Sequence, residues 1–186
     1  MEPEQETTEI TETVEPVKPQ PWLLRWLFDT RISMRRYVLR TGLISLLPSL
    51  AIAFVLGICG VITEETGPAF EASPLELIVL MVIVCPPIET LLMGLVLRIL
   101  SLITKRSIPL AAMSASVWAC LHSIAAPAWG LGVIWPFFVF SCSYLAWRQR
   151  AWWRAILVTS CVHAFQNLLP AIVAAASQYV EVPKVS

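Results

Sequence analysis

The sequence predicts an all-α fold, a polytopic membrane helical bundle of about five transmembrane helices preceded by an N-terminal interfacial helix. Composition is the first reason: 57% of the 186 residues are hydrophobic and 14% are charged, whereas a soluble domain averages about a quarter charged. Long uncharged runs are the second reason, because about 20 apolar residues form a helix that crosses a bilayer. The third is that arginines and tryptophans gather between these runs, as is typical of membrane interfaces.

The first 40 residues divide into two parts. Residues 1–20 contain six Glu and three Pro, and such a composition buries too little apolar surface to fold, so 1–21 is expected to be a disordered acidic tail. No basic segment precedes an apolar core there, which argues against a cleavable signal peptide. Residues 22–40 mix Trp and Phe with five Arg. They predict an amphipathic helix at the membrane surface, with its arginines among anionic lipid headgroups.

The transmembrane bundle is expected over 41–180, with a short C-terminal tail at 181–186. Its spans share a length sufficient to cross the bilayer and are interrupted by charge only at Glu89 and Arg98. They are 41–63, 77–104, the two halves of 107–147 on either side of a turn at 125–130, and 155–180. The acidic segment 64–76, which contains Gly and Pro, is expected to be a loop.

Basic residues indicate the orientation of these spans. If the N-terminus is cytoplasmic, all 13 Lys and Arg except Lys184 fall in the three cytoplasmic regions, and the acidic loop 64–76 lies outside. This agrees with the positive-inside rule. We therefore expect a multi-pass protein of a prokaryotic plasma (cytoplasmic) membrane, with a cytoplasmic N-terminus and the C-terminus outside.

Charge and cysteine content argue against two other classes of protein, nucleic-acid binders and disulfide-linked folds. The formal net charge is zero, which excludes a simple polybasic nucleic-acid binder. All five cysteines lie in apolar stretches without paired metal-type spacing, so they are interpreted as structural thiols and no disulfide framework is expected.

Three ionisable side chains lie within the apolar segments. Glu89 is the only carboxylate deep inside one, and the only two histidines, His122 and His163, lie in two others. An ionisable group in the middle of a membrane helix costs about 3 kcal/mol even on lenient insertion scales, so each is a candidate functional residue. Together with Asn167 they lie 12 to 16 residues from the expected cytoplasmic helix ends, or roughly 18–24 Å. Groups at a common depth can meet in the interior of the bundle.

Local spacing adds to this pattern. His163 and Asn167 are four residues apart and share one face of a helix. Pro86 and Pro87 lack backbone donors and are expected to kink or break the second span just before Glu89. If the helix restarts there, Glu89 lies in its first turn, where the helix dipole favours a carboxylate.

The residue types suit hydrolysis. A carboxylate and an imidazole can activate water, while an amide and a second imidazole can donate hydrogen bonds to a developing oxyanion. Two alternatives stay open at this point. The four groups could be hydrogen-bonded contacts between helices, worth about 0.6 kcal/mol each. Glu and two His could also hold zinc, although the tight spacing of a strong zinc motif is absent; no cofactor is the favoured interpretation.

The same residues resemble the CPBP family of intramembrane proteases, which includes the CAAX prenyl endopeptidases and bacteriocin-processing or immunity proteins. The family pattern is Glu-Glu-x-x-x-Arg after a proline, then Phe-x-x-x-His, then His-x-x-x-Asn. The corresponding segments here, within a core at 77–170, are 87–94 (PIETLLMG), 118–122 (WACLH) and 163–167 (HAFQN). The resemblance implies that Glu89 and His122 activate water and that His163 and Asn167 stabilise the oxyanion. It also implies that the substrate is a membrane-embedded or lipidated protein or peptide.

Two positions depart from the family pattern. Thr90 replaces the second Glu, and Gly94 stands where Arg is usual. The departures favour an alternative in which the chain is a catalytically silent membrane immunity or partner-binding protein. A third hypothesis is proton-coupled transport, since buried Glu and His also relay protons, although five spans show no obvious inverted repeat.

Overall fold

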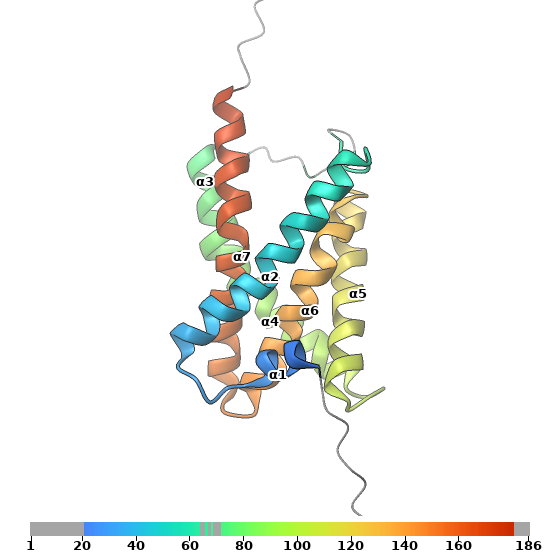
Figure 1. Ribbon diagram of the computed structural model, residues 1–186, viewed down its shortest axis with the longest axis vertical. Helices are drawn as coiled ribbons and strands as arrows, with labels where there is room; N and C mark the ends of the chain where they lie inside the picture. Colours follow the sequence, from blue (N-terminus) through green and yellow to red (C-terminus); the bar gives the residue numbers. More distant parts are fainter. Residues whose placement is uncertain (1–20, 64–65, 67, 69–71, 181–186) are drawn as a thin grey trace, which may run out of the picture.

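The computed structural model describes residues 21–63, 66, 68 and 72–180, and all secondary structure in this part of the chain is helical (Figure 1). A short helix is followed by the long helices of a bundle. The elements are α1 (Trp22–Phe28), α2 (Met34–Ile58), α3 (Pro74–Val79), the π-helical turn η1 (Leu80–Val84), α4 (Cys85–Leu100), α5 (Ser107–Ala125), α6 (Trp129–Arg148) and α7 (Trp152–Val180). The predictions for 1–20 and 181–186 lie outside the described residues.

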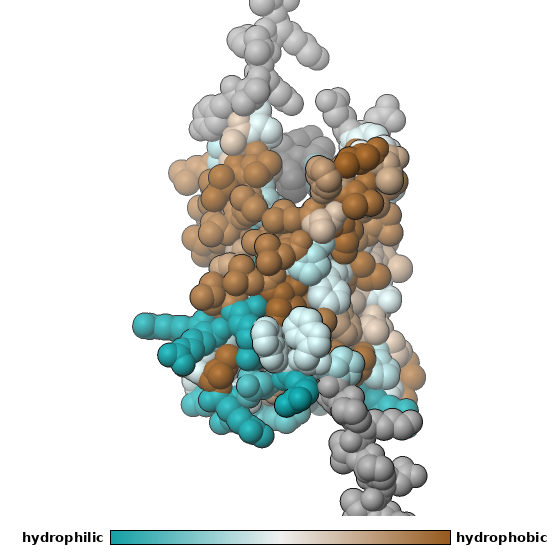
Figure 2. Space-filling view, viewed as in Figure 1, coloured by the Kyte–Doolittle hydropathy of each residue, from teal (hydrophilic) through white to brown (hydrophobic). Residues whose placement is uncertain are grey.

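Five helical segments of the described chain are long and apolar enough to cross a membrane, which confirms the predicted bundle. They are Met34–Ile58, Pro74–Leu100, Ser107–Ala125, Trp129–Arg148 and Trp152–Gln178. Figure 2 shows an apolar surface over most of their length, with hydrophilic side chains gathered at the end where α1 lies. The chain is therefore a multi-pass membrane protein.

The second span begins earlier than predicted because its first turn is capped. Glu76 accepts hydrogen bonds from the backbone N and the side-chain Oγ of Ser73, at 2.9 and 2.6 Å, so the helix starts at Pro74 inside the predicted loop. This capping box satisfies backbone donors that would otherwise lack partners.

The single interfacial helix predicted at 22–40 is two helices. The chain leaves the helical conformation after Phe28, where Asp29 Oδ1 accepts a hydrogen bond from Arg31 N at 3.1 Å, and α2 restarts at Met34. Short polar side chains such as Asp offer the backbone local hydrogen bonds that compete with a helix. Arg40 then donates to the carbonyl oxygens of Trp26 and Asp29, which caps the carboxyl end of α1.

Helix α6 lies at the centre of the bundle. Half of its span is buried, against 22–33% for the other four spans. Its aromatic side chains Phe137 and Phe140 pack in the main core with Trp118 of α5 and Val162 of α7. The remaining faces of the outer helices are apolar and exposed, as expected for helices in contact with lipid.

Candidate active site

The four polar residues singled out by sequence all line one cavity of about 290 Å³ within the bundle. Glu89 comes from α4, His122 from α5, and His163 and Asn167 from α7. Most of the remaining wall is apolar and includes Leu77, Leu80, Met81, Val133 and Phe137. The structure thus brings together all four residues, which lie on three different helices.

The proline pair shapes the segment that carries Glu89, but does not break it. The N–H of Cys85 donates to the carbonyl of Leu80, five residues earlier, so one wide π turn leads directly into α4. A π turn is a common way to absorb an irregularity within a helix. Glu89 is the fifth residue of α4 and lies beyond its first turn. The helix does not restart just before Glu89, so the condition under which the helix dipole would act on Glu89 from a first turn is not met.

Glu89 has His163 as its direct partner. The Oε2 atom of Glu89 lies 3.8 Å from Nε2 of His163. His163 is buried, and its ring stacks on Phe140 with a centroid distance of 4.4 Å. The side chain of Glu89 is 24% exposed. The pair therefore joins an imidazole fixed by packing to a carboxylate that is open to the cavity.

His122 is held by its backbone and by aromatic rings. Its Nδ1 lies 2.9 Å from the carbonyl oxygen of Trp118. A carbonyl oxygen can only accept, so Nδ1 carries the hydrogen, and Nε2 of the neutral ring is left as an acceptor. The ring centroids of Trp129 and Phe137 lie 4.9 and 5.2 Å away. This tautomer has the acceptor that a general base needs.

Asn167 satisfies a carbonyl oxygen in the π turn. Its Nδ2 donates to the carbonyl of Met81 at 3.0 Å. Within a helix, the Met81 carbonyl would accept a hydrogen bond from the N–H of residue 85 or 86. Here the N–H of Cys85 donates to Leu80 instead, and Pro86 has no N–H. The Asn167 amide carries two hydrogens on nitrogen, and this bond uses one of them.

The two departures from the family pattern face a packed interior. Thr90 is 1% exposed, and its Oγ1 has no hydrogen-bond partner in the described part of the chain. A Cβ placed on Gly94 would lie 2.5 Å from the hydroxyl oxygen of Tyr144 and 2.8 Å from its Cζ. Tyr144 of α6 therefore fills the space that a side chain at position 94 would need.

Sequence reasoning missed the groups that orient the site. Phe137 packs edge-on or tilted against both histidines, at 5.2 Å from His122 and 5.6 Å from His163. Nothing in the local sequence distinguishes it from the other phenylalanines. Met81 could have been found, because the proline pair removes donors from the carbonyls that precede it.

Metal ligation was the other open alternative for these side chains. Among the described residues no three His, Cys, Asp or Glu side chains are grouped so that they could hold a metal ion. Glu89 and His163 lie 3.8 Å apart, and the bond from Nδ1 of His122 to a backbone carbonyl leaves Nε2 as the atom of that ring that could bind a metal. Zinc sites use three or four protein ligands, so His122 would have to join the pair for zinc to bind.

Comparison of the chain with protein-family models, curated proteins and solved structures finds no match. The assignment of chemistry therefore depends on the residues themselves: a carboxylate, two imidazoles and an amide on one cavity of a multi-pass membrane bundle.

Proposed function

We propose that the chain is an intramembrane endopeptidase of the CPBP type, which hydrolyses a peptide bond in or near the bilayer. The observation that carries the proposal is the convergence of Glu89, His122, His163 and Asn167 on one cavity between the spans. Burying these polar groups among apolar helices is costly. Their chemistry matches the requirements of peptide hydrolysis: a base for water and donors for an oxyanion.

In this mechanism a water molecule lies between Glu89 and His122 and loses a proton to one of them as its oxygen attacks the substrate carbonyl carbon. The carbonyl π electrons move to its oxygen, giving a tetrahedral oxyanion. Neutral His163 donates from Nε2 to this oxyanion, and Asn167 donates its second amide hydrogen while Met81 holds the first. The proton taken from water then passes to the leaving nitrogen, and the C–N bond breaks.

The substrate is proposed to be a membrane-embedded or lipidated protein or peptide. Leu77, Leu80, Val133 and Phe137 give the cavity an apolar wall, which suits hydrophobic side chains or a lipid chain next to the cleaved bond. The wall also includes Trp129, the first residue of α6, and Ala72, two residues before α3. Helices α3 and α6 begin at the end of the bundle away from α1 (Figure 1), and this is the end from which water is proposed to enter.

The location follows from the same distribution of charge. The arginine-rich end is proposed to face the cytoplasm across the plasma membrane, which places the N-terminus inside and the C-terminus outside. The lipid bilayer is then the immediate environment of the chain, and no nucleic acid is involved.

A second candidate function is a catalytically silent membrane immunity or partner-binding protein. The specific observation in its favour is the packing of Tyr144 against Gly94, which leaves no space for the arginine usual in the family. The buried Thr90 hydroxyl, without a partner among the described residues, shows that the second Glu position also lacks polar contacts. In this alternative the same cavity would bind a segment of a partner without cleaving it.

The test is a comparison of protein termini in membranes and medium from cells that express the wild type or Glu89→Gln at equal levels. Glutamine keeps the shape of the side chain and removes its charge, so new termini should appear only with the wild type. Glu76→Gln is the matched control, because Gln also forms a capping box and position 76 lies outside the cavity wall. Cleavage retained by Glu89→Gln contradicts the enzymatic proposal; a phenotype that survives both Glu89→Gln and His122→Ala supports the silent alternative.

A further inference from the structure

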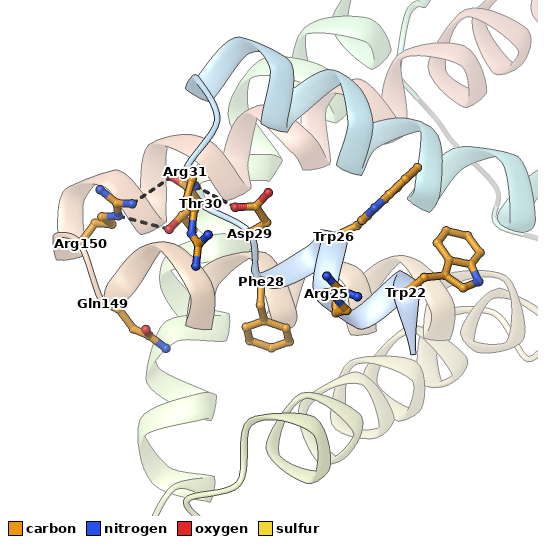
Figure 3. A pocket seen from close by; sticks show the side chains of 9 residues that line it. All are labelled: Trp22, Arg25, Trp26, Phe28, Asp29, Thr30, Arg31, Gln149 and Arg150. Carbon is orange, nitrogen blue, oxygen red and sulfur yellow. Dashed lines mark hydrogen bonds between the residues drawn. The ribbon is translucent and has the colours of Figure 1, made fainter. Parts of the chain in front are cut away.

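A second cavity lies at the arginine-rich end of the bundle, away from the candidate active site. It has a volume of about 680 Å³ and lies between α1, the segment that follows it and the connection between α6 and α7. Figure 3 shows Arg25 and Arg31 on either side of Phe28, while Arg150 reaches Thr30 from the α6–α7 connection. Trp22 and Trp26 complete the wall on the side of α1. Three guanidinium groups therefore border one open space.

The positive charge of this cavity is not neutralised within the described part of the chain. Asp29 is its only lining carboxylate, and that side chain accepts a hydrogen bond from Arg31 N and lies 3.8 Å from Arg40. Neither the Arg25 nor the Arg31 guanidinium has a hydrogen-bond or ion-pair partner among the described residues. Several arginines with one carboxylate between them create a site for an anion.

One of the three arginines is already held in place. Arg150 donates from Nε to Thr30 Oγ1 at 3.2 Å and from Nη2 to the carbonyl oxygen of Thr30 at 3.3 Å. These bonds tie the α6–α7 connection to the segment between α1 and α2. The wall of the cavity is thus built from parts far apart in the sequence, which gives it a defined shape when the bundle is folded.

The position of the cavity identifies the source of the anion. Helix α1 lies across the end of the bundle where the apolar surface gives way to hydrophilic side chains (Figure 2). Trp22 and Trp26 are 64% and 48% exposed at this level, and Trp is typical of the headgroup region. At the headgroup level of a membrane the anion at hand is a lipid phosphate, whose acyl chains could lie along the adjacent apolar surface.

We infer that this cavity binds the headgroup of an anionic phospholipid, with its phosphate between Arg25, Arg31 and Arg150 and its glycerol and acyl portion beside Trp22 and Trp26. Guanidinium groups suit this task because they bind phosphate oxygens in pairs and stay charged. The lipid would join α1 to the α6–α7 connection. The inference is independent of the proposed protease activity.

The test is a titration of the purified full-length protein in neutral detergent with fluorescent phosphatidylglycerol and, separately, phosphatidylcholine. The wild type should prefer phosphatidylglycerol, and Arg25→Gln with Arg31→Gln should weaken that binding by about tenfold or more. The matched control is Arg98→Gln with Lys105→Gln, which removes two exposed charges outside the cavity wall and should change affinity by no more than about threefold. Equal losses in the two double variants would overturn the inference, as would equal affinity of the wild type for both lipids.

Two further experiments distinguish a lipid from other anions as the occupant of the cavity. Inorganic phosphate at equal concentration should not displace phosphatidylglycerol, because it lacks the portion that contacts Trp22 and Trp26; equal competition would overturn the assignment to a lipid. Replacing the six Glu of residues 1–20 by Gln should leave the affinity unchanged. A large gain would show that the chain's own acidic segment occupies the cavity instead. Circular dichroism and size-exclusion chromatography should show that every variant keeps the helical fold.

Discussion

Asn167 of α7 donates a hydrogen bond across the bundle to the carbonyl oxygen of Met81 at 3.0 Å. This bond supplies the donor that Pro86 cannot provide and fixes the amide beside the cavity that also contains Glu89. The π turn therefore supplies the acceptor to which Asn167, the candidate oxyanion donor, is bonded. The proline pair has a local structural role and also creates the acceptor that orients Asn167.

The first prediction concerns this bond. Asn167→Leu should lower the free energy of unfolding by about 0.6 kcal/mol or somewhat more, the range measured for hydrogen bonds within membrane bundles. Pro86→Ala restores an N–H that can reach the Met81 carbonyl, so the loss on Asn167→Leu should be smaller in that background. Unfolding in mixed micelles with increasing sodium dodecyl sulfate, applied to the four proteins of the cycle, measures the coupling. Equal losses in both backgrounds would show that the bond does not depend on the missing proline donor.

The second prediction concerns the turn that positions His122. A Cβ on Gly130 would overlap the carbonyl oxygen of Ala119 and Oγ of Ser123, whereas a Cβ on Gly132 meets nothing within 4 Å. Gly130→Ala should therefore destabilise the bundle by about 1–3 kcal/mol. Gly132→Ala should be neutral or stabilise by up to about 1 kcal/mol, since Ala favours a helix. Thermal unfolding of the two variants checks this, and equal effects would contradict the close approach of α5 and α6.

The third prediction tests position 94, where the pattern of the CPBP family that the chain resembles has arginine. Gly94→Arg alone should destabilise the fold by about 1–3 kcal/mol or more, because the new side chain collides with Tyr144. Adding Tyr144→Ala opens that space, so the double variant should be more stable than Gly94→Arg. The free energy of unfolding of each variant measures this coupling. If Tyr144→Ala brings no recovery, Tyr144 is not what excludes a side chain at position 94.

The fourth prediction concerns metal. If Glu89 activates water directly, cleavage of a substrate found by the comparison of termini should survive dialysis against a strong zinc chelator. A control hydrolase that depends on zinc should lose activity under the same treatment. Activity that is lost on chelation and restored by zinc alone would instead assign Glu89 and the histidines to a metal site.

Much of this fold could be predicted from composition and charge. Long apolar runs, separated by arginines and tryptophans, predict five spans because a bilayer demands about 20 apolar residues in each helix. The pattern failed at 22–40, where the break between Phe28 and Met34 depends on a local hydrogen bond of Asp29 and on capping by Arg40. The mixture of aromatic and basic residues continues on both sides of this break, so the sequence pattern does not show where α1 ends and α2 begins.

The candidate site was also visible in the sequence, because ionisable residues in membrane helices are rare and therefore conspicuous. Glu89, His122, His163 and Asn167 could be named, and their similar depth predicted that they meet. Their partners could not be named. In the structure the carboxylate of Glu89 lies 3.8 Å from His163, and Asn167 donates to the carbonyl oxygen of Met81.

The sequence by itself determined the number of spans, the charged end of the bundle and the polar residues within it, since each follows from the cost of placing charge or bare backbone in lipid. Only the tertiary structure decided which of these residues touch, which rings hold the histidines, and that Tyr144 fills the space beside Gly94. The reason is physical. Depth along a helix can be counted in residues, but the rotation of each helix about its axis depends on packing against all of its neighbours.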